Sequence, residues 1–354
     1  MDQAAKSLKR ILASTRKTMA HALCAVALDY KKRGPYVRCI SPLKAGINKA
    51  GEIVYSSTKS SQELASFEFE CRRCLPCRLN NAREKAIRSF HEAQIHDSNI
   101  FLTLTYNEEN LKSPRLQYRD WQLFIKRLRE KVTRNVTEKD AMDKLYIPYM
   151  VTGEYGDLTK RPHWHAILFN YEPADKEYKY TNELGDRVWT SETLTNLWKK
   201  GNVEYGSVTM ESAGYVARYA AKKLVHGKDQ DHNYDPIHKT SCRKAIGRQW
   251  IEKYYYHTFE NGFIVLPNGQ QMKIPRYYTD WLKKHKFDKY VEYVNGPRVK
   301  AINQAQKIAR KEEIEFLSQI QNYKSGDRYP STLLTIQERV LNSKFKRLNQ
   351  ELKL

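Results

Sequence analysis

The chain of 354 residues carries 62 Lys and Arg against 40 Asp and Glu, which gives a formal net charge of +22. This excess of positive charge predicts a polyanionic partner. Because 40% of the residues are hydrophobic and 12% are aromatic, the chain can bury a sizeable core, which excludes a disordered basic tail. No apolar run approaches the roughly 18 residues of a membrane span, so an integral membrane protein is excluded.

The chain divides into five expected segments. We expect a basic N-terminal arm over residues 1–38, a Cys-rich segment and helix over 39–98, a core over 99–225, a basic, aromatic-rich extension over 226–299 and a charged helical tail over 300–354. The arm carries nine Lys and Arg against two Asp, and Met1 and Met19 are both candidate starts. The stretch from Cys39 to Cys77 is rich in Ser and turn residues, and an amphipathic helix is expected over Asn81–His96.

The core predicts an antiparallel sheet with helices on its face, in the α+β class. Period-two alternation is typical of strands, and apolar residues at i, i+3, i+4 and i+7 are typical of helices. We expect, in chain order, a strand over Ile100–Tyr106, a helix over Asp120–Val132, strands over Leu145–Thr152 and Pro162–Phe169 joined by a hairpin at Gly153–Asp157, a helix capped by Ser191, a strand over Val203–Thr209 and a helix over Ser212–Leu224. Mixed turns are expected to about Pro297, followed by charged helices over Lys300–Phe316 and Leu333–Leu348.

The segment Arg161-Pro-His-Trp-His165 carries the sharpest chemical signal. Side chains two apart on a strand project to the same side, so His163 and His165 can both reach one ion. Glu154 lies nine residues upstream, where the hairpin can fold it back beside the histidines, and Asp157 is a competing carboxylate. Two imidazoles and a carboxylate predict a site with open positions for Mg²⁺ or Mn²⁺. The alternative is a pair of ordinary core histidines.

A tyrosine pair follows on a predicted helix. Tyr215, Tyr219 and Lys223 are spaced at i, i+4 and i+8 and so share one face. A phenol of pKa near 10 is a poor nucleophile at neutral pH, but a metal-polarised phosphodiester and a nearby cation lower the barrier. Lys223 or its neighbour Lys222 can supply that cation, and the spacing favours Lys223. The alternative is an ordinary stripe of core residues.

Three of the six cysteines form a C-x2-C-x2-C cluster. Disulfides are unexpected in a chain of this size, so a reducing cytoplasm follows and a metal suits this spacing better. Cys71, Cys74 and Cys77 need a fourth ligand for a structural Zn²⁺, and Cys39 would complete it, with His91 or His96 as substitutes. The alternative is reduced cysteines in a helix cap.

Basic and aromatic residues supply the candidate contacts to DNA. A groove that tracks a single strand combines cations for the phosphates with rings for the bases. The residues expected in that role are Arg218, Lys222, Arg243, Lys244, Tyr277 and Tyr278. Each basic run taken alone is more often a solvated face.

The motifs resemble those of HUH endonucleases in their rolling-circle initiator branch. The chain is similar, more narrowly, to the replication initiation proteins of gokushovirus-type microviruses. The matching stretches are Phe101-Leu-Thr-Leu-Thr105, Gly153-Glu-Tyr-Gly156 with Arg161-Pro-His-Trp-His165, Tyr215-x3-Tyr219-x3-Lys223, Cys71-x2-Cys-x2-Cys-Arg-Leu79, Ile246-Gly247 with Trp250, and Pro275-Arg-Tyr-Tyr278. The resemblance covers about Cys39 to Trp281.

The resemblance implies an enzyme that nicks one strand at a phage replication origin. One tyrosine attacks the scissile phosphate and becomes a 5′-phosphotyrosine, and the freed 3′-OH primes the host polymerase. The second tyrosine cleaves the regenerated origin, and the displaced strand is joined into a circle. Tyr215, Tyr219, His163 and His165 fall on the family positions, with Glu154 as the third metal ligand.

The implied partners are single-stranded DNA with the phage replication origin and the host replication helicase and polymerase, in the cytoplasm of the infected bacterium. No membrane is implied. Two alternatives remain: a non-catalytic, zinc-dependent nucleic-acid-binding protein, and a single-tyrosine relaxase or transposase, which needs only one of the two tyrosines.

Overall fold

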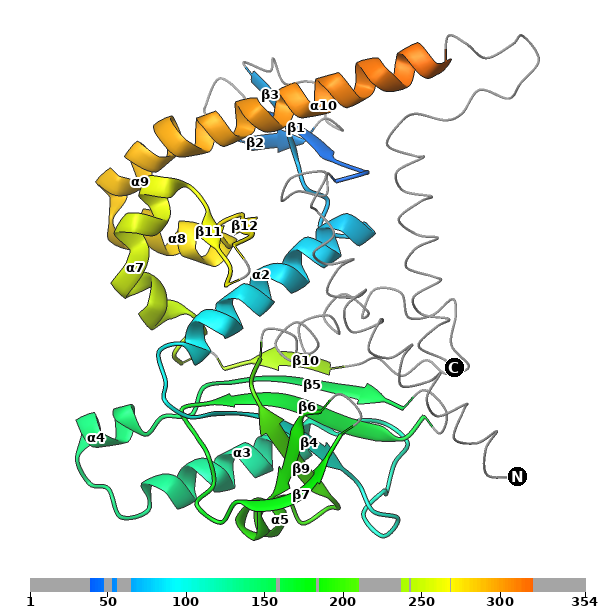
Figure 1. Ribbon diagram of the computed structural model, residues 1–354, viewed down its shortest axis with the longest axis vertical. Helices are drawn as coiled ribbons and strands as arrows, with labels where there is room; N and C mark the ends of the chain where they lie inside the picture. The colour runs from blue at the N-terminus through cyan, green and yellow to red at the C-terminus, as the bar shows by residue number, and fades with distance from the viewer. Residues whose placement is uncertain are drawn as a thin grey trace.

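The centre of the molecule is a seven-stranded sheet in which every neighbouring pair of strands is antiparallel (Figure 1). The computed structural model describes residues 39–47, 53–55, 65–156, 160–182, 185–209, 237–241, 243–267 and 269–320. The strand order is β10-β5-β6-β4-β9-β8-β7. The strands are β4 (Asn99–Thr105), β5 (Tyr149–Tyr155), β6 (Pro162–Phe169), β7 (Glu177–Thr181), β8 (Arg187–Thr190), β9 (Val203–Ser207) and β10 (Ile237–Thr240). The expected α+β class is therefore confirmed.

Each face of the sheet packs on its own helices. The helices beside the sheet are α2 (Leu75–Ala93), α3 (Tyr118–Thr133), the short α4 (Lys139–Lys144) and α5 (Glu192–Trp198). On one face, Leu104 and Trp164 share a buried core with Trp121 and Phe124 of α3. On the opposite face, Ile167 of β6 packs against α2. Because neighbouring residues of a strand point to opposite faces, His163 and His165 lie on the α2 face with Ile167.

Most predicted elements of the core are confirmed with small shifts at their ends. Ser191 caps α5 as expected, because its hydroxyl accepts the backbone N–H of Leu194. β5 extends to Tyr155, so the predicted hairpin residues Gly153 and Glu154 belong to the strand itself. The helix expected over Ser212–Leu224 lies outside the described residues.

Two predictions of irregular structure were wrong. The Cys-rich stretch contains a small antiparallel sheet of order β2-β1-β3, formed by β1 (Leu43–Ile47), β2 (Ile53–Tyr55) and β3 (Ala65–Phe69). The stretch expected to hold mixed turns up to Pro297 is largely helical. It contains α7 (Arg248–Asn261), the β11 (Ile264–Val265) and β12 (Gln271–Met272) hairpin, α8 (Arg276–His285), α9 (Phe287–Tyr293) and a π-helical turn (Val294–Arg298), and α10 (Val299–Ile320) follows.

The C-terminal helices have a core of their own, built on Ile251, Phe259, Tyr278 and Leu282. In the described part of the chain, no helix is both long enough and apolar enough to cross a membrane. The helical C-terminal region is confirmed up to Ile320, and the helix expected over Leu333–Leu348 lies beyond the described residues.

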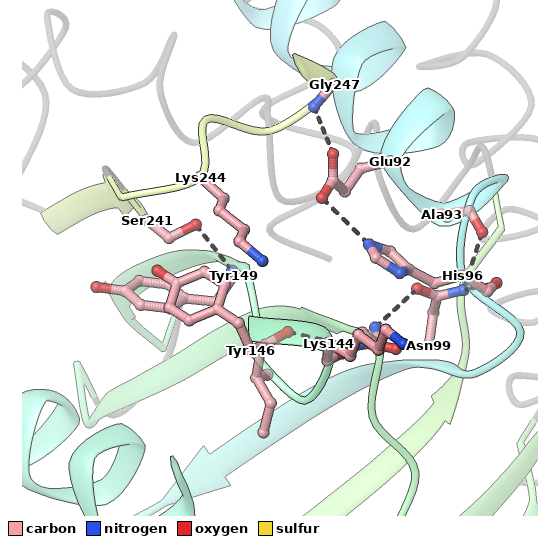
Figure 2. Close-up of polar contacts among 12 residues, drawn as sticks. Glu92, Ala93, His96, Asn99, Lys144, Tyr146, Tyr149, Ser241, Lys244 and Gly247 are labelled. Atoms are coloured by element: carbon pink, nitrogen blue, oxygen red, sulfur yellow. Dashed lines mark hydrogen bonds and ion pairs between the residues drawn. The ribbon is translucent and has the colours of Figure 1, made fainter. Parts of the chain in front are cut away.

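Polar contacts tie this C-terminal region to the sheet and to α2 (Figure 2). The buried carboxylate of Glu92 accepts the backbone N–H of Gly247 at 2.6 Å through one oxygen and contacts Nε2 of His96 at 3.2 Å through the other. Below them, Ser241 bonds to the backbone of Tyr149 at the end of β10. The start of α7 is thus fixed against α2, and β10 against the sheet.

Candidate functional site

Two neighbouring strands bring the predicted metal ligands together. Glu154 of β5 lies directly opposite His163 of β6, and His165 follows on the same face. One carboxylate oxygen of Glu154 stands 3.0 Å from Nε2 of His163 and 3.0 Å from Nε2 of His165. Ligands at about 2.1 Å and at right angles around an octahedral ion lie roughly 3.0 Å apart, so this spacing fits such an ion.

Second contacts hold both imidazoles from behind. Nδ1 of His163 donates to the backbone carbonyl of Arg161 at 3.1 Å, and Nδ1 of His165 lies 3.1 Å from the hydroxyl of Thr103. Metal-binding histidines in proteins are usually oriented by such a bond at the other ring nitrogen. In a neutral His163 ring this bond leaves Nε2 as the ligand atom, so these contacts support a metal site more than an ordinary pair of core histidines.

The electrostatics of Glu154 suit a ligand that stays ionised. Burial opposes the charged form of its carboxylate, but the hydrogen bonds from His163 and His165 outweigh burial and lower its pKa to about 2. The side chain of His163 remains 19% exposed, against 9% for Glu154. The residues therefore fit a divalent ion that is anchored on its inner side and keeps an open side for a phosphate oxygen.

The four predicted zinc ligands also meet. The sulfur atoms of Cys39, Cys71, Cys74 and Cys77 all lie within 4.8 Å of one another, and the sulfurs of Cys39 and Cys74 are 3.8 Å apart. A tetrahedral ion with Zn–S bonds of about 2.3 Å places its sulfurs roughly 3.8 Å apart, so the cluster fits zinc.

Backbone amides prepare the cysteine cluster for thiolates. The N–H of Cys71 points to the sulfur of Cys39, and that of Cys74 points to the sulfur of Cys71, each at 3.3 Å. Burial raises the pKa of Cys71, but the N–H groups of Cys74 and Arg73 outweigh it and lower the pKa to about 7. Low thiol pKa values favour the metal-binding form.

Neither histidine proposed as a substitute for Cys39 joins the cluster. Nδ1 of His91 lies 3.0 Å from the hydroxyl of Tyr278, and its ring stacks on Trp250. His96 contacts Glu92 instead. Cys39 is therefore the fourth member of the cluster.

The predicted DNA contacts meet different fates. Arg243 is exposed and pairs with Asp143 at 3.0 Å, and Lys244 donates to the backbone carbonyl of the same residue. Tyr277 is half-buried beneath the guanidinium of Arg88, which lies 4.1 Å from the ring centre. Tyr278 is fully buried in the C-terminal core and has no free face for a base, so this part of the prediction was wrong.

Several predicted site residues lie outside the described part of the chain. They are Asp157, Tyr215, Arg218, Tyr219, Lys222 and Lys223. Sequence reasoning also left Thr103 as an ordinary strand former, although it contacts His165. The signal for its role was the register of the sheet, which places Thr103 opposite His165, and a single sequence does not reveal that register.

Comparisons with known proteins give the family. A family model that describes the replication-associated protein ORF2 matches residues 99–224. Replication-associated protein VP4 of Bdellovibrio phage phiMH2K is 55% identical over 318 residues, which cover 90% of this chain and 100% of that protein. The chain belongs to the phage replication-associated proteins. This membership confirms the resemblance to gokushovirus-type replication initiators and gives the chain a role in phage replication.

More distant members agree. Replication-associated protein ORF4 of Chlamydia phage 1 is 32% identical over 252 residues, which cover 67% of this chain and 60% of that protein. Replication-associated protein ORF2 of Spiroplasma virus 4 is 28% identical over 335 residues, which cover 89% of this chain and 98% of that protein. No solved structure matches the chain significantly.

Proposed function

We propose that this replication protein is a metal-dependent HUH endonuclease and strand transferase. It nicks one strand at the phage origin to start rolling-circle replication and later joins the displaced strand into a circle. The observation that carries the proposal is the single carboxylate oxygen of Glu154 at 3.0 Å from Nε2 of both His163 and His165. With the phage-replication family, this donor set favours phosphodiester chemistry over a structural role.

The metal site would act on the scissile phosphate. Mg²⁺ or Mn²⁺ held by Glu154, His163 and His165 would polarise a phosphate oxygen. The hydroxyl of Tyr215 or Tyr219 gives up its proton and forms the new P–O bond. The bond from phosphorus to the 3′-oxygen breaks, and that oxygen leaves with the electron pair and takes up a proton. Lys223 offsets the charge of the attacking phenolate.

The second tyrosine supports termination. The family resemblance places Tyr215 and Tyr219 one helical turn apart, so the tyrosine that is not esterified can cleave the regenerated origin. The 3′-OH released by this second cleavage then attacks the first phosphotyrosine, which closes the circle and frees that tyrosine. The partners we propose are single-stranded DNA with the origin and the host helicase and polymerase, in the cytoplasm of the infected bacterium.

A structural zinc and a basic path for the strand complete the proposal. The four cysteines hold one structural Zn²⁺ and fix the small β2-β1-β3 sheet to the start of α2. Arg218, Lys222, Arg243, Lys244 and Tyr277 contribute to the path of the DNA strand. Native mass spectrometry of the folded protein should show about one zinc per chain, and a metal-free folded protein would reject the zinc site.

The test of the endonuclease is a cleavage assay on single-stranded circular phage DNA. Wild type should cleave with added Mg²⁺ or Mn²⁺ and not without it. His165→Ala should lose cleavage, because one of three ligands is gone, while its thermal unfolding temperature stays close to that of wild type. His257→Ala is the matched control, because His257 is exposed on α7 and far from the cluster in sequence. Undiminished cleavage by His165→Ala would overturn the proposal in favour of a non-catalytic DNA-binding protein.

A further inference from the structure

An open pocket lies outside the candidate metal site, where the end of α2 meets the start of α7 and the β11–β12 hairpin. Its volume is about 580 Å³, within the range of ligand sites. Three aromatic side chains line it, Phe90, Trp250 and Tyr254, together with the polar side chain of Gln94. A pocket with several rings and one amide suits a flat, hydrogen-bonding ligand.

Trp250 is held rigidly at the wall of this pocket. One side of its ring system stacks on His91, with ring centres 3.5 Å apart and planes within 10° of each other. Its indole N–H donates to the side-chain carbonyl of Gln94 at 3.1 Å. Tyr254 follows one turn later on α7, with its ring centre 5.0 Å from that of Trp250. The rings therefore need little reordering to accept a planar ligand.

The supports behind Trp250 are buried. His91 is only 2% exposed and is itself stacked on Tyr278. Gly247, three residues before Trp250, is fixed to α2 by the carboxylate of Glu92 (Figure 2). The position of the indole is thus set from two sides, while Tyr254 is 38% exposed and accessible at the pocket.

We propose that this pocket binds an unpaired nucleobase of the single-stranded DNA on which the protein acts, at a distance from the scissile phosphate. The proposal rests on the proposed function for the identity of the strand. A base presents a flat π-face for stacking between aromatic rings and polar edges for Gln94.

Charge complementarity also points to a strand. Residues 243–298 carry eleven Lys and Arg against five Asp and Glu, so a phosphate backbone is attracted to this region. The ammonium group of Lys253 lies 5.1 Å from the ring centre of Tyr254 and can meet a phosphate beside the bound base. A purely apolar partner segment would gain nothing from these cations.

The test compares the affinity of the full chain for two single strands of equal length. One is oligo-dT and the other carries only abasic sugar-phosphate units, and binding is followed by fluorescence anisotropy without added Mg²⁺ or Mn²⁺. Tyr254→Ala should weaken binding of oligo-dT by about 5- to 150-fold, the usual effect of losing one stacked base. Binding of the abasic strand should change less than about twofold, because no base is present to stack.

Tyr256→Ala is the matched control, since Tyr256 lies on the same helix, is 48% exposed and does not line this pocket. It should bind both strands like wild type. Trp250→Leu provides a second variant that keeps an apolar side chain against His91, and it should repeat the effect of Tyr254→Ala. Unchanged binding of oligo-dT by Tyr254→Ala, or an equal loss on both strands, would overturn the proposal.

This measurement also separates the pocket from the endonuclease. A protein that prefers oligo-dT through Tyr254 but forms no covalent adduct keeps the base pocket and loses the proposed chemistry. A protein that forms the adduct but binds equally well without Tyr254 loses the pocket alone.

Discussion

Thr103 is the residue whose role depends most directly on the metal site. Its hydroxyl lies 3.1 Å from Nδ1 of His165 and so fixes the ring that presents Nε2 to the ion. Thr103→Val keeps the shape of the side chain but removes this contact. We expect Mn²⁺ affinity to fall about 10- to 100-fold, the usual effect of losing such a partner. Cleavage measured against Mn²⁺ concentration should recover at high Mn²⁺.

The matched control for this prediction is Thr105→Val. Thr105 lies on the same strand and faces His163 in the register of the sheet, so the change in size and strand preference is equal. Equal Mn²⁺ dependence of the two variants would show that Thr103 does not orient the ligand.

His91 gives a prediction for pH. Burial lowers its pKa from 6.5 to about 3, so the folded protein keeps this ring neutral while the unfolded chain takes up a proton below about pH 6.5. Its contribution to stability is therefore complete above pH 6.5 and is lost as the pH falls toward 3. Between about pH 7 and pH 5 this one group should cost about 2 kcal/mol of the free energy of unfolding.

Urea unfolding of His91→Phe at several pH values tests this effect. The variant keeps an aromatic ring against Trp250 but cannot titrate, so its stability should fall less between about pH 7 and pH 5 than that of wild type. His257→Phe, at an exposed position, should follow the wild-type pH dependence. Parallel curves for His91→Phe and wild type would contradict the assignment of the pH effect to His91.

The start of α7 depends on a glycine that has no room for a side chain. Gly247 has φ of +80°, and a Cβ there would lie 2.4 Å from the hydroxyl of Tyr278. Tyr278 is fully buried against His91 and cannot move away cheaply. Gly247→Ala should therefore cost about 1–2 kcal/mol for the left-handed backbone and about 1–3 kcal/mol more for the overlap.

Gly269→Ala isolates the backbone part of that cost. Gly269 has φ of +76°, but a Cβ there meets no atom within 4 Å. Urea unfolding should rank Gly247→Ala clearly below Gly269→Ala in stability. The packing of α7 on α8 would not be the reason for Gly247 if the two variants lost equal stability.

The predictability of each element followed from how much of its environment lies close in sequence. β4 and β6 alternate regularly because one face packs on α3, so their period-two pattern was readable. The helices α7 and α8 were missed because they are short and rich in Tyr, Lys and Glu, and their apolar faces meet only in a core formed across the chain. Tyr278 was assigned to DNA for the same reason, since its burial depends on α2.

On the scale of the whole molecule, α2 connects the parts that carry the proposed functions (Figure 1). It begins at the cysteine cluster, packs against the sheet face that carries the metal ligands, and ends at the aromatic pocket. The convergence of His163, His165 and Glu154 could be predicted because a hairpin joins their strands. The pocket could not, because Phe90 and Trp250 are 160 positions apart in the sequence.

The measurement that tests the central claim most directly is the mapping of the peptide that becomes linked to DNA. Single-stranded circular phage DNA, Mn²⁺ and the protein should give a 5′-phosphotyrosyl peptide that contains Tyr215 or Tyr219. Each single Tyr→Phe variant should retain some cleavage through the other tyrosine but lose the second cleavage and circle formation. The double Phe variant should form no adduct although its metal ligands are intact. A linked peptide elsewhere in the chain, or complete circularisation by one single variant and none by the other, would contradict the paired-tyrosine account.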